Sequence, residues 1–241
     1  MTAPPGDLAK IRANCRDRLR VVEKELTRCY YHQQVWTDIR EAITKRFPNA
    51  DGTFINSYSQ MYGTGQAMAI RRLVDHDEKP WSLWRLYDMV RRNPQLLSRA
   101  DYVEASGTHF GDPGTWQYEA GRERAADGFT SSMGSGPYAD PAIIAEYQQR
   151  MTSSAAKVKE FVDQRIAHLD PDGMMLDITF DEIHASLDYL ADAANRIQVL
   201  LDGSTVMYSH ATIVGDWREP LRTSLFPLTP GHTWGAGVSF S

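Results

Sequence analysis

One continuous helical pattern near the start of the chain constrains the fold more than any other feature. Over 7–47, apolar side chains recur at steps of three, four and seven residues, with charged side chains between them. This spacing is typical of a helix with one buried face. Such a helix would be about 60 Å long at about 1.5 Å per residue. We expect either a kink near 30–34 or an apolar first half that packs against a partner, because soluble monomers avoid large exposed apolar patches.

Two further helices are expected in the next part of the chain. Apolar residues at helical spacing predict one over 57–74, and another over 81–93 ends before a proline. Gly63 and Gly65 lie inside the first of these segments. A glycine within a helix costs about 1 kcal/mol relative to alanine. The two glycines therefore indicate either a close approach of another backbone or a break in the helix.

The second half of the chain contains the clearest helical signals. Asp140 followed by Pro141 is typical of a helix start, and an apolar period continues over 140–170 until a proline ends it. Thr179 and Glu182 have the spacing of a capping box, and a regular apolar stripe follows them up to a glycine. These patterns predict two long helices.

Two segments lack a helical period. Glycines interrupt 106–138, which predicts a long inserted loop with at most a short helix near 116–124. The last segment, 204–241, reads as an irregular C-terminal arm. The sequence shows no strand pattern of any length. We therefore expect a single all-α domain over 1–241, built as a bundle of four main helices with a glycine-rich insertion.

Composition narrows the class of protein. The net charge of −5 argues against a protein that coats nucleic acid non-specifically, although it allows a local basic site. Cys15 and Cys29 share one helical pattern but lie too far apart along it for a disulfide, so two free core cysteines are expected. This usage suits a reducing cytoplasm. The sequence has no signal-peptide pattern or membrane-length apolar segment, so we expect a cytoplasmic protein with no membrane partner.

Familiar catalytic motifs are absent, and two Arg–His pairs remain as candidates. There is no phosphate loop, CxxC, HExxH or GxSxG motif, and histidines never stand at i and i+4. No cofactor and no metal site are therefore expected. Arg165 and His168 lie three residues apart at a helix end. A neutral imidazole can take a proton from a ribose 2′-hydroxyl, and a guanidinium can hold the phosphate.

A structural interpretation of the same residues remains open. Cationic groups near a helix C-terminus complement its dipole without taking part in any reaction, and the adjacent Asp170 can pair with either group. The same alternatives apply to a second set near the end of the second helix, which comprises Arg71, Arg72, Asp75 and His76. The basic runs at 16–20 and 91–92 are interpreted as solvated faces unless they converge in space.

Three parts of the sequence resemble the AbiU2-like branch of the HEPN superfamily, whose members are helical proteins associated with bacterial abortive infection. The first part reads "AIRRLVDHDEKPWSLWRLYDMV". The second is "VKEFVDQRIAHLD" followed by "TFDEIHASLDYLADAANRIQVLLDG", and the third is "DWREPL". The resemblance implies a homodimer of a bundle of four to five helices. It also implies a metal-independent endoribonuclease in a phage-defence or toxin system, or a relative that has lost the activity.

The family's catalytic motif is an arginine, four to six residues and then a histidine. His168 matches the histidine, but the positions for the arginine hold Phe161, Val162 and Asp163. Arg165 is too close, and Arg71 with His76 has the spacing in a different helix.

Two functional hypotheses follow from these residues. The first is a HEPN-type endoribonuclease, with His168 as general base and Arg165 as phosphate clamp in a site composed from two protomers. The second is a non-catalytic helical dimer that recognises a protein or nucleic-acid partner, such as RNA, within a defence system. The Arg–His pair at a helix end supports the first, and the departure from the motif, the overlong first helix and the glycine-rich loop support the second, so the sequence favours neither.

Overall fold

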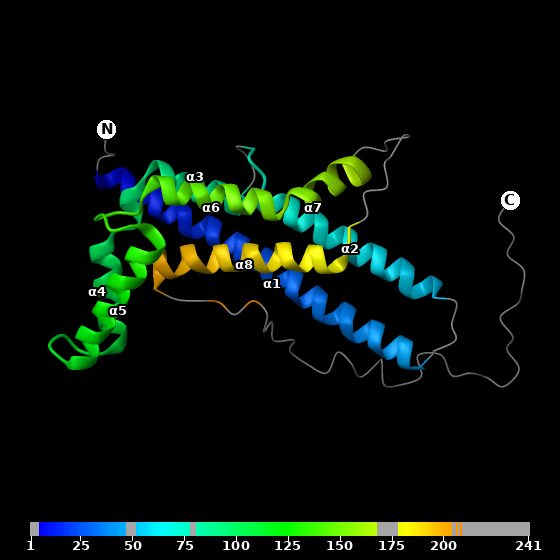
Figure 1. The fold of residues 1–241 in the computed structure, drawn as a ribbon, viewed down its shortest axis with the longest axis horizontal. Coiled ribbons are helices and arrows are strands. Elements are labelled where there is room, and N and C mark those ends of the chain that lie inside the picture. Colours follow the sequence, from blue (N-terminus) through cyan, green and yellow to red (C-terminus); the bar gives the residue numbers. More distant parts are fainter. Residues whose placement is uncertain are drawn as a thin grey trace, which may run out of the picture.

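The computed structural model describes residues 5–46, 52–77, 81–167 and 178–203, together with 206 and 208. The described part of the chain is helical and contains no strand, so the predicted all-α class is confirmed (Figure 1). Its main elements are α1 (Pro5–Arg46), α2 (Thr53–Leu73), α3 (Leu83–Arg92), α4 (Arg99–Phe110), α5 (Trp116–Met133), α6 (Pro141–Ser154), α7 (Ala156–Phe161), η2 (Val162–Ala167) and α8 (Phe180–Asp202). A short turn, η1 (Pro94–Leu96), joins α3 to α4.

The long first helix exists as predicted and runs through the whole bundle. It is continuous over 42 residues, including 30–34. Its first half does not project, because its apolar stripe is buried against α2, α3 and α8. The buried positions are Cys15, Leu19, Val22, Leu26, Cys29 and Trp36. Both cysteines are free, as expected.

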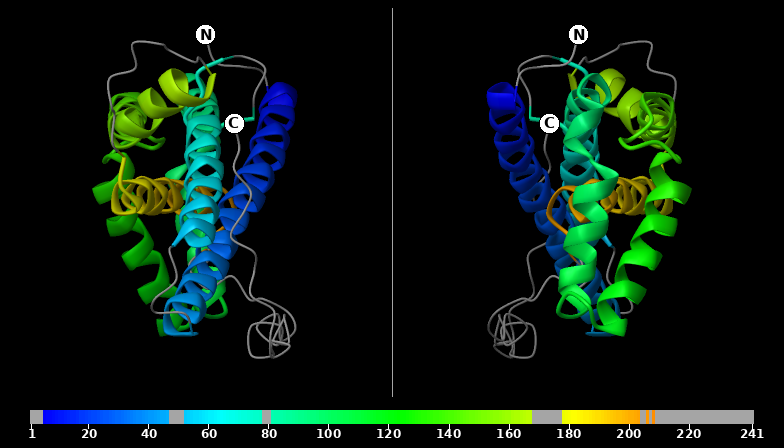
Figure 2. Two further views of the ribbon diagram at one scale, coloured as in Figure 1. Left: turned by 90° about the vertical axis from the view of Figure 1, so that its right-hand side faces the viewer. Right: turned by 90° about the vertical axis from the view of Figure 1, so that its left-hand side faces the viewer.

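The core lies between α1, α2, α3, α6 and α8. Figure 2 shows the molecule along its long axis, with α1 on one side and α6 on the other. The α8 helix begins with the predicted capping box, in which the Thr179 side chain accepts from the Glu182 backbone and Glu182 accepts from the Thr179 backbone. The predicted start of α6 is confirmed as well, since the Asp140 side chain accepts from the backbone N–H of Ala142. The second helix begins four residues earlier than the expected 57.

The prediction of an irregular loop over 106–138 is wrong. The segment holds the end of α4 and all of α5, which form a helical hairpin that hangs from one end of the bundle (Figure 1). Gly107 and Gly121 lie inside these helices and serve close packing, whereas Gly111 and Gly134 follow the helix ends. A Cβ on Gly107 would stand 2.9 Å from the Tyr118 ring, and one on Gly121 would stand 2.7 Å from the Phe110 ring. The two helices can approach this closely only because these positions lack a side chain.

The single helix expected over 140–170 is divided. It consists of α6, α7 and the π-helical turn η2, with a break at Ala155. The predicted arm over 204–241 lies outside the described residues, apart from Val206 and Tyr208. The backbone N–H of Val206 donates to Asn195 Oδ1 at 3.0 Å, and Tyr208 is buried. The chain therefore turns back onto α8 after that helix ends.

Candidate functional site

The first candidate pair lies at the edge of the described residues. Arg165 falls within η2, but its side chain, His168 and Asp170 lie outside the described part of the chain. Their roles as phosphate clamp, general base and acidic neighbour therefore stay predictions. Two residues before Arg165, the carboxylate of Asp163 is described, and it accepts from Lys159 Nζ at 2.6 Å.

The second candidate set is divided between two sides of the α2 C-terminus. Arg71 Nε donates to Asp163 Oδ1 at 2.8 Å, and Arg71 Nη1 donates to Asp75 Oδ2 at 3.2 Å. The bond with Asp163 raises the pKa of Arg71 and lowers the pKa of Asp163. His76 instead stacks on Trp84, with ring centroids 4.2 Å apart. Arg71 and His76 therefore face different neighbours, and two carboxylates already compensate the charge of Arg71.

A buried carboxylate organises three arginines on α3. Asp88 is 3% exposed and forms ion pairs with Arg85, Arg91 and Arg92 at 3.3, 2.9 and 2.9 Å. These positions lie three or four residues from Asp88, so they share its face of the helix. Burial alone would raise the pKa of the Asp88 carboxyl, but the arginine bonds hold it below its ordinary value. The carboxylate is hidden, whereas the side chains of Arg91 and Arg92 remain 40% and 66% exposed.

A second shielded carboxylate joins α1 to α2. Glu25 on α1 accepts from Arg28 Nη2 at 2.6 Å and from Arg72 Nη2 of α2. The Glu25 side chain is 19% exposed, against 53% for Arg28 and 48% for Arg72. As at Asp88, water meets mainly the guanidinium groups.

An exposed aromatic side chain lies near the start of α3. Trp81 stands two residues before this helix, next to its N-cap Ser82, and is 46% exposed. The guanidinium carbon of Arg18 lies 5.4 Å from the centroid of its ring, a cation–π arrangement. Arg18 Nε also donates to Asn14 Oδ1 at 2.8 Å, which fixes the arginine along α1.

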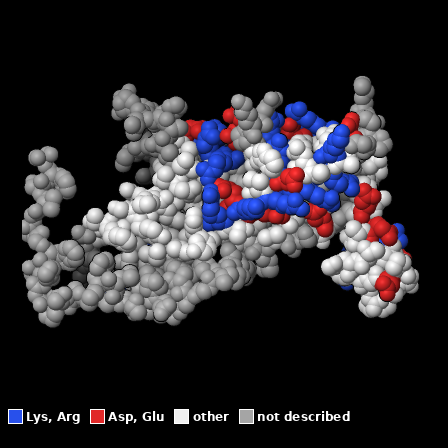
Figure 3. All heavy atoms as spheres, turned by 180° about the vertical axis from the view of Figure 1, so that it is seen from behind, with Lys and Arg blue, Asp and Glu red and all other residues white. Residues whose placement is uncertain are grey.

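These residues form one surface, which we name the basic face. Seen from behind, Lys and Arg side chains gather in a band over α3 and the first half of α1, with acidic side chains between them (Figure 3). Around Asp88 and Glu25, five guanidinium groups meet two carboxylates, a formal charge of +3. The basic face comprises Arg18, Arg28, Arg72, Arg85, Arg91, Arg92 and Trp81. The basic runs at 16–20 and 91–92 lie on α1 and α3, two helices that pack against each other; Arg18 contacts Trp81, and Arg91 and Arg92 pair with Asp88.

Sequence reasoning missed the two carboxylates that build the basic face. Asp88 could have been found, because arginines stand at the helical spacings from it in the sequence. Glu25 and Arg72 are separated by 47 residues, and nothing in the local sequence indicates that they meet.

A half-buried histidine lies in an aromatic cluster between α1, α2 and α8. Tyr62 Oη and His184 Nε2 are 2.7 Å apart. The Tyr62 ring stacks on Trp36 with centroids 4.8 Å apart, and Phe180 packs against both. Burial lowers the pKa of His184 from its ordinary value of 6.5, against the weaker opposing effect of Asp188. A neutral imidazole can accept the Tyr62 proton, whereas an imidazolium cannot.

This histidine makes folding depend on pH. Because its pKa is lower in the folded chain, the unfolded chain takes up a proton first as the pH falls. We expect the contribution of His184 to the free energy of unfolding to be fully present above pH 6.5. It should be lost as the pH falls from there toward the pKa of His184 in the folded chain. Urea denaturation at about pH 7.5 and about pH 5 measures the loss, which should be smaller in His184→Gln, whose amide still accepts from Tyr62. An equal loss in both proteins would show that His184 does not contribute.

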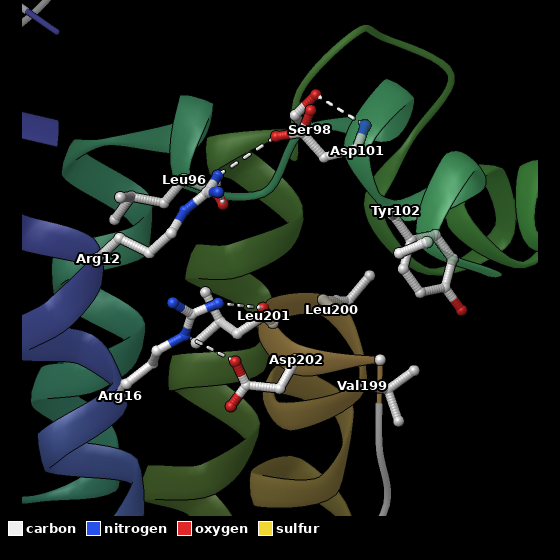
Figure 4. Close-up of a pocket in the computed structure, with 12 residues that line it drawn as sticks. Arg12, Arg16, Leu96, Ser98, Asp101, Tyr102, Val199, Leu200, Leu201 and Asp202 are labelled. Atoms are coloured by element: carbon white, nitrogen blue, oxygen red, sulfur yellow. Dashed lines mark hydrogen bonds and ion pairs between the residues drawn. The ribbon is translucent and has the colours of Figure 1, made fainter. Parts of the chain in front are cut away.

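A pocket of about 290 Å³ lies where α1, α4 and α8 meet (Figure 4). Arg12 Nη2 donates to the Leu96 carbonyl at 3.0 Å, and Arg16 Nη2 donates to the Leu201 carbonyl at 3.3 Å. Arg16 Nε also donates to Asp202 Oδ1 at 2.7 Å. The carboxylate of Asp101 on α4 forms an ion pair with Arg12. The formal charges cancel, so the pocket does not favour an anion. Arg12 instead joins the start of α1 to η1 and α4, and Arg16 joins it to the end of α8.

The comparisons with known proteins found no relative of this chain. No family model matches the chain, and no curated protein or solved structure matches it. Within the described ranges, no group of three or more His, Cys, Asp or Glu side chains could hold a metal ion. None of the helices described is both long and apolar enough to cross a bilayer.

Proposed function

We propose that the chain binds single-stranded RNA through the basic face, as a non-catalytic helical module. The observation that carries this proposal is the pair of shielded carboxylates, each of which holds several arginines with their exposed groups toward water. Arginines fixed in this way present their free N–H groups without a further loss of side-chain entropy. Phosphates are the natural ligands of such groups.

The exposed ring of Trp81 favours a single-stranded nucleic acid over a duplex as the ligand. Unpaired bases stack on exposed aromatic rings, and this contact is worth about 1–3 kcal/mol per base. Trp81 is exposed and stands beside Arg18, so one strand can place a base on the ring and a phosphate on a neighbouring guanidinium group. The net charge of −5 makes binding depend on this local surface and on salt.

The resemblance to abortive-infection proteins supports RNA as the nucleic acid and a phage-defence or toxin system as the setting. The ribonuclease hypothesis remains the alternative, because His168 and the Arg165 side chain lie outside the described residues. No described contact assembles a phosphate site at Arg71, whose charge Asp75 and Asp163 compensate.

Fluorescence anisotropy with a labelled oligouridine of about 20 nucleotides tests the proposal, since sites of this kind cover roughly 4–16 nucleotides. Trp81→Ala should weaken binding by about 5- to 150-fold through the loss of one stacked base. Arg28→Gln combined with Arg92→Gln should lower the slope of log affinity against log salt by about 1–2, because two phosphate contacts are lost. Matched single-stranded DNA and duplex RNA are the comparison ligands.

Two substitutions away from the basic face serve as controls. Trp116→Ala removes a tryptophan that is 76% exposed on the hairpin, and Arg150→Gln removes an arginine paired at i,i+4, as Arg92 is. Neither should change affinity. Wild-type affinity in Trp81→Ala and the double variant, or no binding by the wild-type chain, would disprove the proposal. Cleavage of the oligouridine that His168→Ala abolishes would support the ribonuclease instead.

A further inference from the structure

An outward apolar stripe runs along α2, and most of its side chains are exposed among the described residues. The helix contains no charged residue from Thr53 to Ile70. On its outer side, Phe54 and Met61 are 64% and 73% exposed, and Met68 is 38% exposed. Together with Tyr58 and Gly65, these positions follow one another at steps of four and three residues, which places them on one face. Apolar surface of this regularity marks an interaction site.

The two glycines of α2 have different surroundings. A Cβ on Gly63 would stand 3.2 Å from Phe180 Cε1, so this glycine serves the packing of α2 against α8. A Cβ on Gly65 would meet no atom within 4 Å. A helical glycine costs about 1 kcal/mol relative to alanine, and packing among the described residues does not explain Gly65. It leaves a gap in the middle of the apolar stripe, between Met61 and Met68.

We infer that this stripe is the seam of a homodimer in which two copies of α2 cross antiparallel at Gly65. A glycine at the crossing point allows two helix backbones to approach closely, and the methionine side chains of each copy fill the space beside the other's glycine. A two-fold axis through Gly65 makes the contact self-complementary. This inference does not rest on the proposed binding of RNA.

The distribution of charge selects a second copy in this orientation. Arg72 lies seven residues after Gly65 and Tyr58 lies seven residues before it. In an antiparallel crossing, Arg72 of each copy therefore lies opposite the Tyr58 ring of the other, which is a favourable cation–π arrangement. A parallel crossing would bring the arginines of the two copies together. Because the rest of the stripe is uncharged, no like charges meet within the seam, although each chain carries −5.

The position of the stripe leaves most of the basic face open. Figure 3 shows surface without charged side chains over the first part of α2, next to the band of basic side chains. A seam centred on Gly65 takes Arg72 into the interface and leaves the α3 arginines and Trp81 outside it on both copies. A single pair of crossing helices is small for an interface, so we expect a dimer with a micromolar dissociation constant.

Cross-linking of the full chain tests the crossing point. Gly65→Cys places a thiol on the two-fold axis, so mild oxidation should convert most of the protein into a disulfide-linked dimer. Gly128→Cys on α5 is the matched control, because a Cβ there would also meet no atom within 4 Å. The natural thiols should not react, since burial raises the pKa of Cys15 to about 11 and that of Cys29 to about 12.

Sedimentation velocity measures the association itself. The wild-type chain should be dimeric at tens of micromolar, and Gly65→Glu should weaken the dimer by about 100-fold because two like charges meet on the axis. Gly128→Glu should sediment as the wild type does. Circular dichroism establishes whether each variant is folded. If Gly65→Glu does not fold, the cross-linking of Gly65→Cys tests the inference instead. Three results would overturn the inference: a monomeric wild-type chain, equal cross-linking of both cysteine variants, or an unchanged dimer in Gly65→Glu. A monomeric wild-type chain would indicate that another part of the same chain covers the α2 stripe.

Discussion

Replacement of Asp88 by alanine should lower the free energy of unfolding by about 3–5 kcal/mol, the usual cost of removing one partner of a buried ion pair. Asp88 is 3% exposed and compensates three arginines. One of them, Arg85, has a side chain that is only 16% exposed. Without the carboxylate, this guanidinium stays partly buried beside two like charges. Urea denaturation followed by circular dichroism measures the loss.

An exposed ion pair provides the control for this experiment. Asp17 pairs with Arg20 at i,i+3, and both side chains are more than half exposed. Asp17→Ala should change stability by no more than about 0.5 kcal/mol, because exposed pairs contribute little. Similar small losses in both variants would mean that the Asp88 cluster is solvated and does not fix the arginines. The basic face would then lack the rigidity on which the proposed function depends.

Trp36→Ala should destabilise the fold by about 3–5 kcal/mol, the range for truncation of a large aromatic side chain in a core. Trp36 is 4% exposed and stacks on Tyr62, and its Nε1 donates to Ser59 Oγ at 3.2 Å. Phe180 lies against the same ring, and the Arg40 guanidinium lies 4.6 Å from its centroid. The residue therefore joins α1, α2 and α8 at the end of the bundle opposite the hairpin. Chemical denaturation provides the measurement.

Trp116→Ala is the matched control, since it makes the same change at a side chain that is 76% exposed. It should alter stability by about 0.5 kcal/mol or less. If Trp36→Ala were equally mild, the aromatic cluster would not hold the far end of α1 and α2 together. The surface offered by α2 would then not be rigid enough to pair as inferred.

The sequence predicted those helices whose ends are capped by side chains close to them in the sequence. The Thr179 capping box and the Asp140–Pro141 start each depend on side chains within three residues of the helix end, and both were confirmed. The break at Ala155 was missed because the apolar period continues through it. Next to the break, the Ser186 hydroxyl of α8 donates to the Ser154 carbonyl at 2.7 Å, a tertiary contact that no local pattern indicates.

The hairpin was missed for a different reason. Glycines at 107 and 121 were interpreted as breaks, yet each faces a side chain of the other helix. Thr115 offered a usable signal, because its hydroxyl accepts from the Tyr118 backbone three residues later. At the candidate site, Arg71 was identified but its partner Asp163 was not, since 92 residues separate the two. Pairings over such distances depend on how helices pack and leave no local pattern.

The position of the hairpin indicates where another domain can be inserted into the chain. The α4 and α5 helices pack chiefly on each other, and the turn between them lies at the end remote from the bundle (Figure 1). A reporter domain inserted at 112–114 would leave the core helices in their present order. Exposed loop tips of this kind tolerate domain insertion best. A fluorophore attached there would report on the molecule without touching α2 or the arginines of α3.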